Sequence, residues 1–322
     1  MISSLEIKNL RGIREGKLEG LAALTVLVGP NGCGKSTILD SLLIARSVSG
    51  ATALFGSAAA GPQVVAARHG RLREWQRWFY WRGEQRGPCA IVAESDNGLR
   101  MTVALHGVPV APDFKLDRVR TAPPGVVEYR PGPEPEWVPD VCLLGAGACV
   151  PATPLHQLYT EAVQQGRQEQ LIQIVQTVLP GSKRIEILTE GDSPVLHVVY
   201  PNRSVPVEFA GDGVHALLRM SMEIARPPGA LVLIEEPEIH QHPGGMRQAI
   251  RAILAAVRQA VQVVLTTHSL EFIDILLGES TDDDLNKLAL FRLKLKDGEL
   301  LSARLPGPEV ARVRHEIEDD LR

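Results

Sequence analysis

Residues 21–46 have the sequence LAALTVLVGPNGCGKSTILDSLLIAR, and this stretch decides the fold class. It begins with a short, nearly continuous apolar run that stops at Gly29 and Pro30, which is typical of a buried strand entering a turn. Apolar side chains then recur at helical spacing from Ile38 onward, so the turn leads into a helix. Between the two, residues 29–36 fit the pattern G-x-x-x-x-G-K-[ST], which indicates a phosphate-binding loop when a strand precedes it and a helix follows it.

The residue types in this loop suit a phosphate-bearing ligand. Glycines allow backbone N–H groups to converge on phosphate oxygens, and the helix that begins near Lys35 directs the positive end of its dipole to the same place. Lys35 adds a full positive charge, and the hydroxyl of Ser36 is a ligand for Mg²⁺. A glycine-rich turn that arose by chance is the alternative. The residues expected around the ligand are Gly29, Pro30, Asn31, Gly32, Cys33, Gly34, Lys35 and Ser36.

Two adjacent carboxylates follow a second apolar run at residues 231–234. Carboxylates do not belong at the end of a buried strand unless they meet a cation or solvent. Opposite a phosphate-binding loop, Glu235 is expected to hold Mg²⁺ through its water. Glu236 is expected to orient or deprotonate the water that attacks the γ-phosphate. A strand that simply reaches the surface at this point is the alternative.

A polar cluster from Thr266 to Ser269 ends the next apolar strand. This places it at the carboxyl edge of the sheet, where α/β proteins bind ligands. His268 would sense the γ-phosphate from there, and a purely structural histidine is the alternative. Ser269 is not expected to be a nucleophile, because no Gly-x-Ser-x-Gly turn surrounds it.

A glycine-rich turn at Gly211, Asp212 and Gly213 opens a helix pattern. A turn of this kind is most often a simple cap. Its functional interpretation is a second anion-binding helix start, which would face a nucleotide held by another subunit.

The spacing Glu238-x-His240-x-His242 could ligate a metal ion. We prefer a loop without metal. The segment directly follows the acidic strand end, Pro243 interrupts it, and no further ligand cluster is near in sequence.

Composition and charge narrow the function classes. The 322 residues include 34 Lys and Arg against 38 Asp and Glu, a net charge of −4. The chain is therefore not a basic DNA-coating protein, and any DNA contact is local or arranged by an assembly. The most basic stretch, residues 68–86, holds three of the four tryptophans. It could stack on single-stranded nucleic acid, but we favour a helix and strand with buried aromatics, because consecutive aromatics do not form one exposed face.

Neither a disulfide framework, a zinc site nor a membrane anchor is expected. The four cysteines are scattered without a CxxC pair, which suits a reducing cytosol. No apolar run approaches the roughly 18 residues of a membrane span. Glu6, Lys8 and Arg11 lie where a signal peptide needs apolar residues, so we expect a cytoplasmic protein with no membrane contact.

The first and last thirds of the chain alternate strand and helix patterns, which indicates an α/β fold with a mostly parallel core sheet flanked by helices. We expect a single domain over 1–322, in which 1–50 and 205–322 form the nucleotide-binding core. Residues 51–204 are expected to form a β-rich and helical insertion lobe. Local signals predict hairpins at Asp96-Asn-Gly and at Asp297-Gly298, and a break between two helices near Gly166.

Four segments in this order resemble the ABC-type ATPase heads of the SMC/RecF/OLD group: GPNGCGKST, AGDGVHALL, LVLIEEPEIHQHP and VVLTTHS. The likeness is greatest to the stand-alone ATP-binding proteins of the AAA_21/AAA_15 type. The opening LEIKNLRGI and the closing KLKDGELLSARL extend the resemblance over nearly the whole chain. It implies a P-loop NTPase fold of the ABC type with an antiparallel β lobe.

The resemblance also implies roles for individual residues, with ATP and Mg²⁺ as ligands. In that family ATP is bound between two heads, each of which supplies its signature motif to the other's nucleotide. The implied roles are the Walker A loop for Asn31 to Thr37, the Walker B acid for Glu235, the catalytic glutamate for Glu236, the switch histidine for His268, the signature for Gly211 to Gly213, and the interface-crossing D-loop for His240 to His242.

The chain departs from the family pattern at several points. Glu235 replaces the commoner Asp, and water-mediated contact to Mg²⁺ can absorb the extra methylene. The signature lacks its usual Ser, so its phosphate contact falls to backbone N–H groups or is weaker. The Q-loop glutamine is not placed, with Gln157 and Gln164 as candidates. No long heptad arms and no TOPRIM-like nuclease region are visible.

These observations predict an Mg-dependent ATPase that drives head-to-head dimerisation as a molecular switch. Its expected role is DNA repair or anti-phage defence, with a nuclease or other effector protein acting in trans. The alternatives are the ATPase subunit of a membrane transporter, which normally carries an LSGGQ-like signature, and an ATP-binding regulator with little turnover.

Overall fold

The computed structural model of the 322-residue chain describes residues 1–50, 89–106, 115–121, 126–127, 141–145, 148–150, 154–209, 211–239 and 241–314. The basic segment 68–86 and His240 lie outside these residues. Within them, most strands join one 13-stranded sheet. In spatial order its strands are β7 (Val126–Val127), β6 (Lys115–Thr121), β5 (Arg100–His106), β4 (Cys89–Ser95), β1 (Ile2–Leu10), β2 (Ile13–Glu19), β16 (Glu299–Pro306), β15 (Leu288–Lys296), β3 (Leu24–Val28), β14 (Gln262–Thr266), β13 (Leu231–Glu235), β8 (Val141–Gly145) and β9 (Ala148–Val150).

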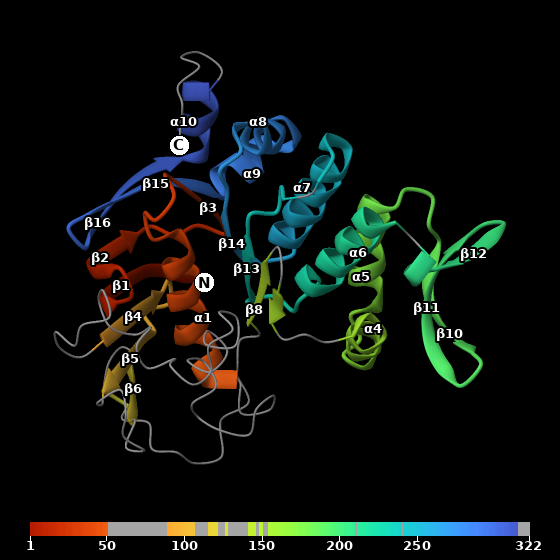
Figure 1. Cartoon of the computed structure of the whole chain (residues 1–322), viewed down its shortest axis with the longest axis horizontal. Helices are drawn as coiled ribbons and strands as arrows, with labels where there is room; N and C mark the ends of the chain where they lie inside the picture. Colours follow the sequence, from red (N-terminus) through yellow and green to blue (C-terminus); the bar gives the residue numbers. More distant parts are fainter. Residues whose placement is uncertain are drawn as a thin grey trace.

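The centre of this sheet is parallel, and its flanks are mostly antiparallel, with one short parallel pairing between β16 and β2 (Figure 1). Strands β15, β3, β14, β13 and β8 pair in parallel with one another. On one side, β1, β2, β4, β5, β6 and β7 form an antiparallel meander. All residues of β3 and β14 are buried, as expected for strands covered on both faces. The predicted α/β class, with a parallel core and an antiparallel part, is confirmed.

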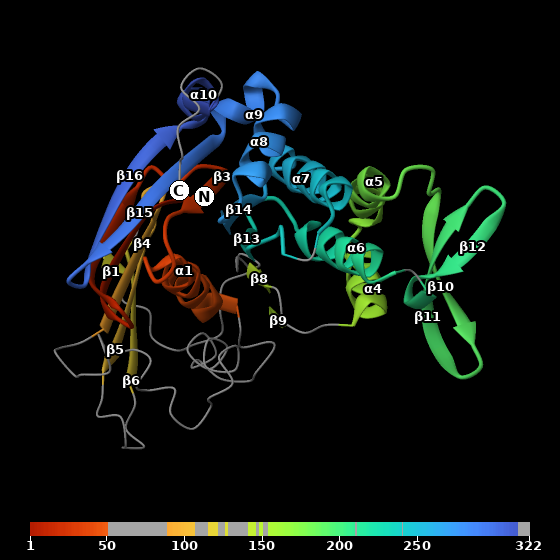
Figure 2. The ribbon, with the colours of Figure 1, turned by 45° about the horizontal axis from the view of Figure 1, so that its top comes forward.

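Side-chain alternation assigns the residues of each central strand to two separate cores. In β13, Leu231 and Leu233 pack in the core shared with α1 (Lys35–Gly50), whereas Val232 and Ile234 pack in the core on the other face. The helices of that second layer are α4 (Leu155–Gln164), α5 (Gln168–Val178), α6 (Asp212–Ile224), α7 (Pro243–Arg258) and α8 (Leu270–Glu279). Helices α1 and α6 therefore cover opposite faces of the central strands (Figure 2).

A separate three-stranded antiparallel sheet precedes α6. It consists of β10 (Arg184–Glu190), β11 (Ser193–Tyr200) and β12 (Arg203–Pro206), and the short 3-10 helix η3 (Val207–Phe209) leads from it toward α6. In both views this sheet lies beyond α5 and α6, at the far end of the molecule from β1 and β2 (Figures 1 and 2).

The local sequence signals are confirmed where the structure describes them. Residues 96–99, which include the predicted Asp96-Asn-Gly turn, join β4 to β5, and Gly166 (φ 70°) separates α4 from α5. Asp297 (φ 50°) and Gly298 (φ 83°) form the turn between β15 and β16, where both positions need left-handed backbone. The short helices α9 (Asp282–Asn286) and α10 (Gly307–Arg312) complete the C-terminal part.

The predicted insertion, residues 51–204, contains two kinds of structure. Strands β4 to β9 from this region hydrogen-bond into the same sheet as β3 and β13, whereas α4, α5, β10 and β11 lie outside that sheet. The division into a nucleotide-binding core and an insertion lobe stays a prediction. Among the described residues, no helix combines the length and the apolar character that a membrane crossing requires.

Candidate functional site

The glycine-rich loop between β3 and α1 has backbone conformations that require glycine. Gly29, Gly32 and Gly34 have φ values of 145°, 78° and 102°. A Cβ atom on Gly29 would lie 2.4 Å from the carbonyl oxygen of Leu293 in β15, so that end of the loop is sealed against the sheet. A Cβ atom on Gly32 would meet nothing within 4 Å, so this part of the loop borders open space. The loop is therefore tightly packed against the sheet at Gly29 and unobstructed at Gly32.

Lys35 is the first residue of α1, and its ammonium group lies over the loop. The residue is only 7% exposed. Its Nζ donates hydrogen bonds to the carbonyl oxygens of Gly29 at 2.7 Å and Pro30 at 3.1 Å. No ion pair between described residues involves Lys35. Its Nζ also donates to Cys33 Sγ at 3.8 Å, so the ammonium group is held by uncharged groups beside a helix start, an arrangement that suits an anionic ligand.

Ser36 and Glu235 meet although 199 positions separate them in sequence. The Ser36 hydroxyl, at the start of α1, donates a 2.5 Å hydrogen bond to Glu235 Oε1, at the end of β13. A hydroxyl and a carboxylate are the hard oxygen ligands that Mg²⁺ prefers, together with water and phosphate oxygens. The donor set therefore fits the predicted Mg²⁺ site.

Glu236 and His268, the two predicted catalytic residues, also lie side by side. Glu236 Oε1 is 3.4 Å from His268 Nε2, and both side chains are about one-third exposed, at 30% and 33%. Glu236 has a left-handed backbone (φ 49°), which is unusual for a residue with a side chain. Its N–H donates to the carbonyl oxygen and the hydroxyl of Thr266, at 3.1 and 3.2 Å, and this contact holds the strained residue in place.

The neighbouring parallel strands β3, β14 and β13 explain why these groups converge. Their carboxyl ends meet at one edge of the sheet, and the loop 29–34, Thr267 and Glu235 follow or end these three strands. The structure therefore brings together the loop, Ser36, the two glutamates and His268. Their chemical roles stay predictions.

The turn at Gly211 lies at the start of α6, on the other side of the sheet from the glycine-rich loop and Lys35. Gly211 is the N-cap of α6 (φ −58°, ψ 155°), and no side chain caps this helix start. Because α6 and α1 pack on opposite faces of the sheet, Gly211, Asp212 and Gly213 do not belong to the layer that carries Lys35. The two Q-loop candidates, Gln157 and Gln164, are exposed positions of α4 in the same layer as α6.

Two other polar residues singled out in the sequence act as helix caps. The Ser269 hydroxyl accepts a 3.1 Å hydrogen bond from the N–H of Phe272 at the start of α8. His242 Nδ1 accepts from the N–H of Gly244 at 3.2 Å at the start of α7. Within the described ranges no group of three or more His, Cys, Asp or Glu side chains is arranged to hold a metal ion. These contacts give Ser269 and His242 structural roles.

Two polar contacts close to the site could not be predicted from sequence patterns. Arg11, in a left-handed turn (φ 53°), forms an ion pair with the fully buried Asp40 of α1, which lies one turn after Ser36. Glu238 appeared only in a metal-like spacing, yet its Oε1 accepts from Thr267 Oγ1 at 2.7 Å and from the His268 N–H at 3.0 Å. The only sequence pattern that pointed to Glu238 was the presence of three acidic residues within four positions at the end of a strand.

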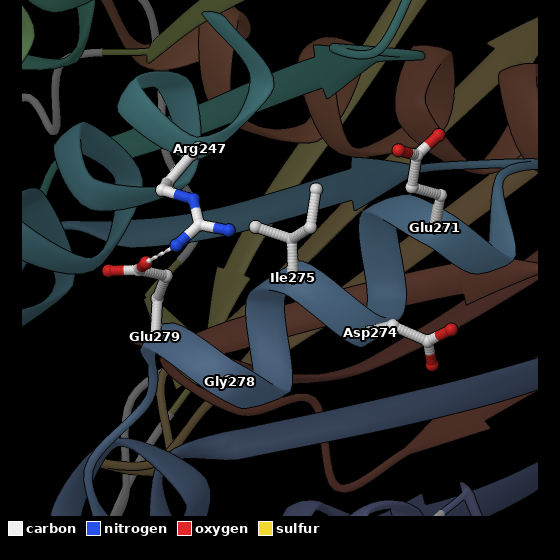
Figure 3. A pocket seen from close by; sticks show the side chains of 6 residues that line it. All are labelled: Arg247, Glu271, Asp274, Ile275, Gly278 and Glu279. Carbon is white, nitrogen blue, oxygen red and sulfur yellow. Dashed lines mark hydrogen bonds and ion pairs between the residues drawn. The ribbon is translucent and has the colours of Figure 1, made fainter. Parts of the chain in front are cut away.

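A pocket of about 410 Å³ is lined by residues of α7 and α8 (Figure 3). Its lining residues are Arg247, Glu271, Asp274, Ile275, Gly278 and Glu279. Arg247 and Glu279 neutralise each other at 3.2 Å. None of the residues predicted for the site lines this pocket.

The sequence matches the model of one known protein family over more than half of its length. Residues 1–53 and 156–273, more than half of the chain, match the family model AAA_15, described as the AAA ATPase domain. The chain belongs to this family. The matched segments include the loop 29–37, Gly211 to Gly213, Glu235, Glu236 and His268. This AAA ATPase domain is thus a nucleotide-binding module, as the sequence resemblance implied.

Two curated relatives come from the archaeon Methanocaldococcus jannaschii. An 85-residue segment is 40% identical to its uncharacterized protein MJECL10, over 26% of this chain and 33% of that protein. A 114-residue segment is 29% identical to the uncharacterized protein MJECL11, over 35% of this chain and 98% of that protein. The chain therefore matches one-third of the length of the first relative and nearly all of the second.

Solved structures show the same fold at low sequence identity. The SMC head domain from Thermotoga maritima aligns over 95% of this chain and 98% of its own, at 15% identity and a TM-score of 0.50. The SMC head with an extended coiled coil from Pyrococcus furiosus, bound to the C-terminal domain of ScpA, aligns over 99% of both chains, at 11% identity and a TM-score of 0.58. The AAA ATPase domain described here therefore has the P-loop NTPase fold of SMC heads.

Proposed function

We propose that this protein is an Mg²⁺-dependent ATPase that works as a molecular switch, with two heads associating on ATP. The observation that carries the proposal is the convergence of Ser36, Glu235, Glu236 and His268 beside the glycine-rich loop. Membership of the AAA ATPase domain family supports the choice of ATP as ligand.

In the proposed binding step the loop and Lys35 hold the phosphate groups. The ammonium group exchanges its contacts with the Gly29 and Pro30 carbonyls for phosphate oxygens, which form stronger, charge-assisted hydrogen bonds. Ser36 and Glu235 would hold Mg²⁺, which when bound offsets charge on the β- and γ-phosphate oxygens.

In the proposed hydrolysis step Glu236 is the general base. Its carboxylate is partly exposed and lies 3.4 Å from His268 Nε2, so one side faces the histidine while solvent reaches the group. Glu236 would orient the attacking water and accept its proton. His268 would hold the carboxylate in place and contact the γ-phosphate. The left-handed backbone of Glu236 fixes the direction in which its side chain leaves the strand.

Two features support a second head as partner. The N-terminus of α6 has no side-chain cap and lies on the sheet face opposite α1, so its phosphate-binding role requires a nucleotide held by another chain. Phe209, two residues before Gly211, is 79% exposed. An exposed aromatic side chain at this place favours burial against another protein surface.

Replacement of Glu236 by Gln tests this function. The amide keeps the shape of the carboxylate but cannot accept a proton, so ATP binding should persist while hydrolysis falls by roughly 10²–10⁴-fold. The stalled protein should then accumulate as a dimer, which light scattering with Mg-ATP would measure. Glu271→Gln, on an exposed position of α8, is the matched control and should leave both properties unchanged.

Two results would contradict the proposal. Unchanged hydrolysis by Glu236→Gln would exclude this residue as the base. A protein that stays monomeric at saturating ATP, or that dimerises without ATP, would exclude the ATP-gated association. That result would not affect the assignment of the nucleotide-binding residues.

For the cellular role, we propose DNA repair or anti-phage defence together with a nuclease or other effector protein. The resemblance to the SMC/RecF/OLD group motivates this choice. A DNA-linked role predicts that single-stranded or double-stranded DNA stimulates the ATPase rate in a salt-dependent manner. An ATPase rate and a light-scattering profile that DNA leaves unchanged at low salt would contradict it.

A further inference from the structure

Glu238 makes contacts that the proposed chemistry does not use. Its Oε1 accepts two hydrogen bonds from the turn after β14, from Thr267 Oγ1 at 2.7 Å and from the backbone N–H of His268 at 3.0 Å. A single carboxylate oxygen therefore ties the segment after β13 to the residue that faces Glu236.

The turn that Glu238 contacts is fixed at every other point. Thr267 is fully buried, and its N–H donates to the carbonyl oxygen of Leu27 in β3 at 3.2 Å. Its Oγ1 accepts from the N–H of Ser269 at 3.0 Å, and Ser269 caps α8. The residues on both sides of His268 are thereby held, and the N–H of His268 itself is held by the Glu238 carboxylate, next to the ring that faces Glu236.

The second oxygen of Glu238 indicates what kind of role the carboxylate has. Oε2 is buried and has no hydrogen-bond partner among the described residues. Leaving one buried carboxylate oxygen without a partner costs stability, so stability alone does not explain a glutamate here. Both side-chain hydrogen bonds that described residues make to Glu238 use Oε1, an acceptor that an amide oxygen can replace.

We propose that Glu238 is a positioning residue that acts through His268, and that its acceptor oxygen, not its negative charge, carries this role. The inference rests on the proposed function, because His268 and Glu236 are the pair that it positions. Loss of the acceptor would release the His268 N–H and shift the ring. A shift of about 1 Å in a catalytic group costs up to about 10²-fold in rate.

A matched pair of variants tests the proposal. Glu238→Gln keeps chain length and an acceptor oxygen, whereas Glu238→Met keeps chain length and removes the acceptor. We expect Glu238→Gln to retain kcat within about threefold, and Glu238→Met to lose about 10- to 100-fold in kcat with the KM for ATP nearly unchanged. Equal losses in both variants would overturn the proposal, because they would indicate a role for the charge. Retained activity in both would overturn it as well.

A double-mutant cycle tests whether Glu238 acts through His268. In a His268→Ala background, Glu238→Met should cause no further loss, because the group it positions is gone. Additive losses would show that Glu238 acts independently of His268. If Glu238→Met does not fold, Thr267→Val removes the hydroxyl that donates to Glu238 and accepts from the Ser269 N–H, and it should lower kcat in the same direction by a smaller factor, because the His268 N–H keeps its acceptor. Thr267→Ser is the control that retains the hydroxyl, and unchanged kcat in Thr267→Val would contradict the proposal.

The same assays separate this inference from the proposed function. If Glu236→Gln hydrolyses ATP normally, the proposed function fails and the positioning role falls with it. If Glu236→Gln is inactive but Glu238→Met is fully active, the proposed function stands and only the positioning role is wrong.

Discussion

The starts of α1 and α6 are both glycine-rich helix N-termini, but the fold treats them differently. The loop before α1 has three glycines with positive φ and a buried lysine held inside it. The start of α6 has an ordinary backbone at Gly211, where an added Cβ would meet nothing within 4 Å. At the start of α1, residues of the same chain supply the loop and the lysine. At the start of α6, no side chain caps the helix, and Lys35 lies on the opposite face of the sheet.

A third helix start shows what a purely structural N-terminus looks like. At α9, Thr281 Oγ1 accepts from the Asp284 N–H at 3.3 Å, and the Thr281 N–H donates to Asp284 Oδ2 at 2.8 Å. This capping box closes the helix end with its own side chains. The first turn of α1 has no acidic residue, so it lacks such a closure. The start of α9 is thus closed by its own side chains, whereas the first turn of α1 carries no acid that would oppose the proposed anionic ligand.

The largest expected effect is at the start of α1. Lys35→Ala removes the full charge from the loop, and a charge-assisted contact to phosphate is worth about 3 kcal/mol, or roughly 10²-fold in Kd. We therefore expect ATP binding to fall below detection in calorimetry at micromolar protein. Lys287→Ala, which removes an exposed lysine paired with Asp283, is the control and should bind ATP normally. Normal turnover by Lys35→Ala would refute the assignment of this loop.

An intermediate effect is expected at the start of α6. Gly211→Arg fits the backbone (φ −58°) and meets open space within its own chain, so folding should be unaffected. At an interface with a second head the added side chain would cost about 1–3 kcal/mol, or about 10- to 100-fold in dimer affinity. In the Glu236→Gln background we expect ATP binding without a stable dimer in light scattering.

The matched control for this variant is another open glycine. Gly278 in α8 also has nothing within 4 Å of its Cβ position, and Gly278→Arg should leave the dimer intact. A Gly211→Arg protein that still dimerises fully on ATP would place the contact surface elsewhere. The difference between α1 and α6 would then reflect capping alone.

The smallest effect is expected at the closed start of α9 and depends on pH. Burial acts to raise the pKa of Asp284, but hydrogen bonds from Arg258 and Thr281 outweigh it and lower the pKa from 3.8 to about 2. The folded state therefore favours the carboxylate, and this stabilisation is complete above about pH 4 and is lost as the pH falls toward 2. Because Arg258 is half-exposed, we expect Asp284→Asn to lower the stability at pH 7 by about 1 kcal/mol.

Urea unfolding at several pH values measures this effect. Asp284→Asn should reduce the loss of stability between pH 4 and 2. Asp283→Asn is the control, since Asp283 is 72% exposed and pairs with Lys287 across one helical turn. Equal destabilisation by both variants would mean that general helix-dipole interactions, and not the Asp284 capping box, stabilise α9.

The sequence by itself determined the local parts of this structure. The strand, loop and helix around residues 24–46, the turn at Asp297-Gly298 and the helix break at Gly166 follow from backbone preferences and from the period of apolar residues. These depend on neighbours in sequence, so local physics is sufficient. The strand-end positions of Glu235 and His268 also followed, because parallel strands end at one edge.

Only the tertiary structure decided the contacts between distant segments. The Ser36–Glu235 hydrogen bond, the attachment of Glu238 to the His268 turn, and the placement of α1 and α6 on opposite sheet faces depend on strand order. Strand order is set by how two separate apolar cores pack on one sheet, with β8 entering beside β13 from a distant part of the chain. That packing is a property of the whole chain, because a strand's own residues specify its faces but not its neighbours.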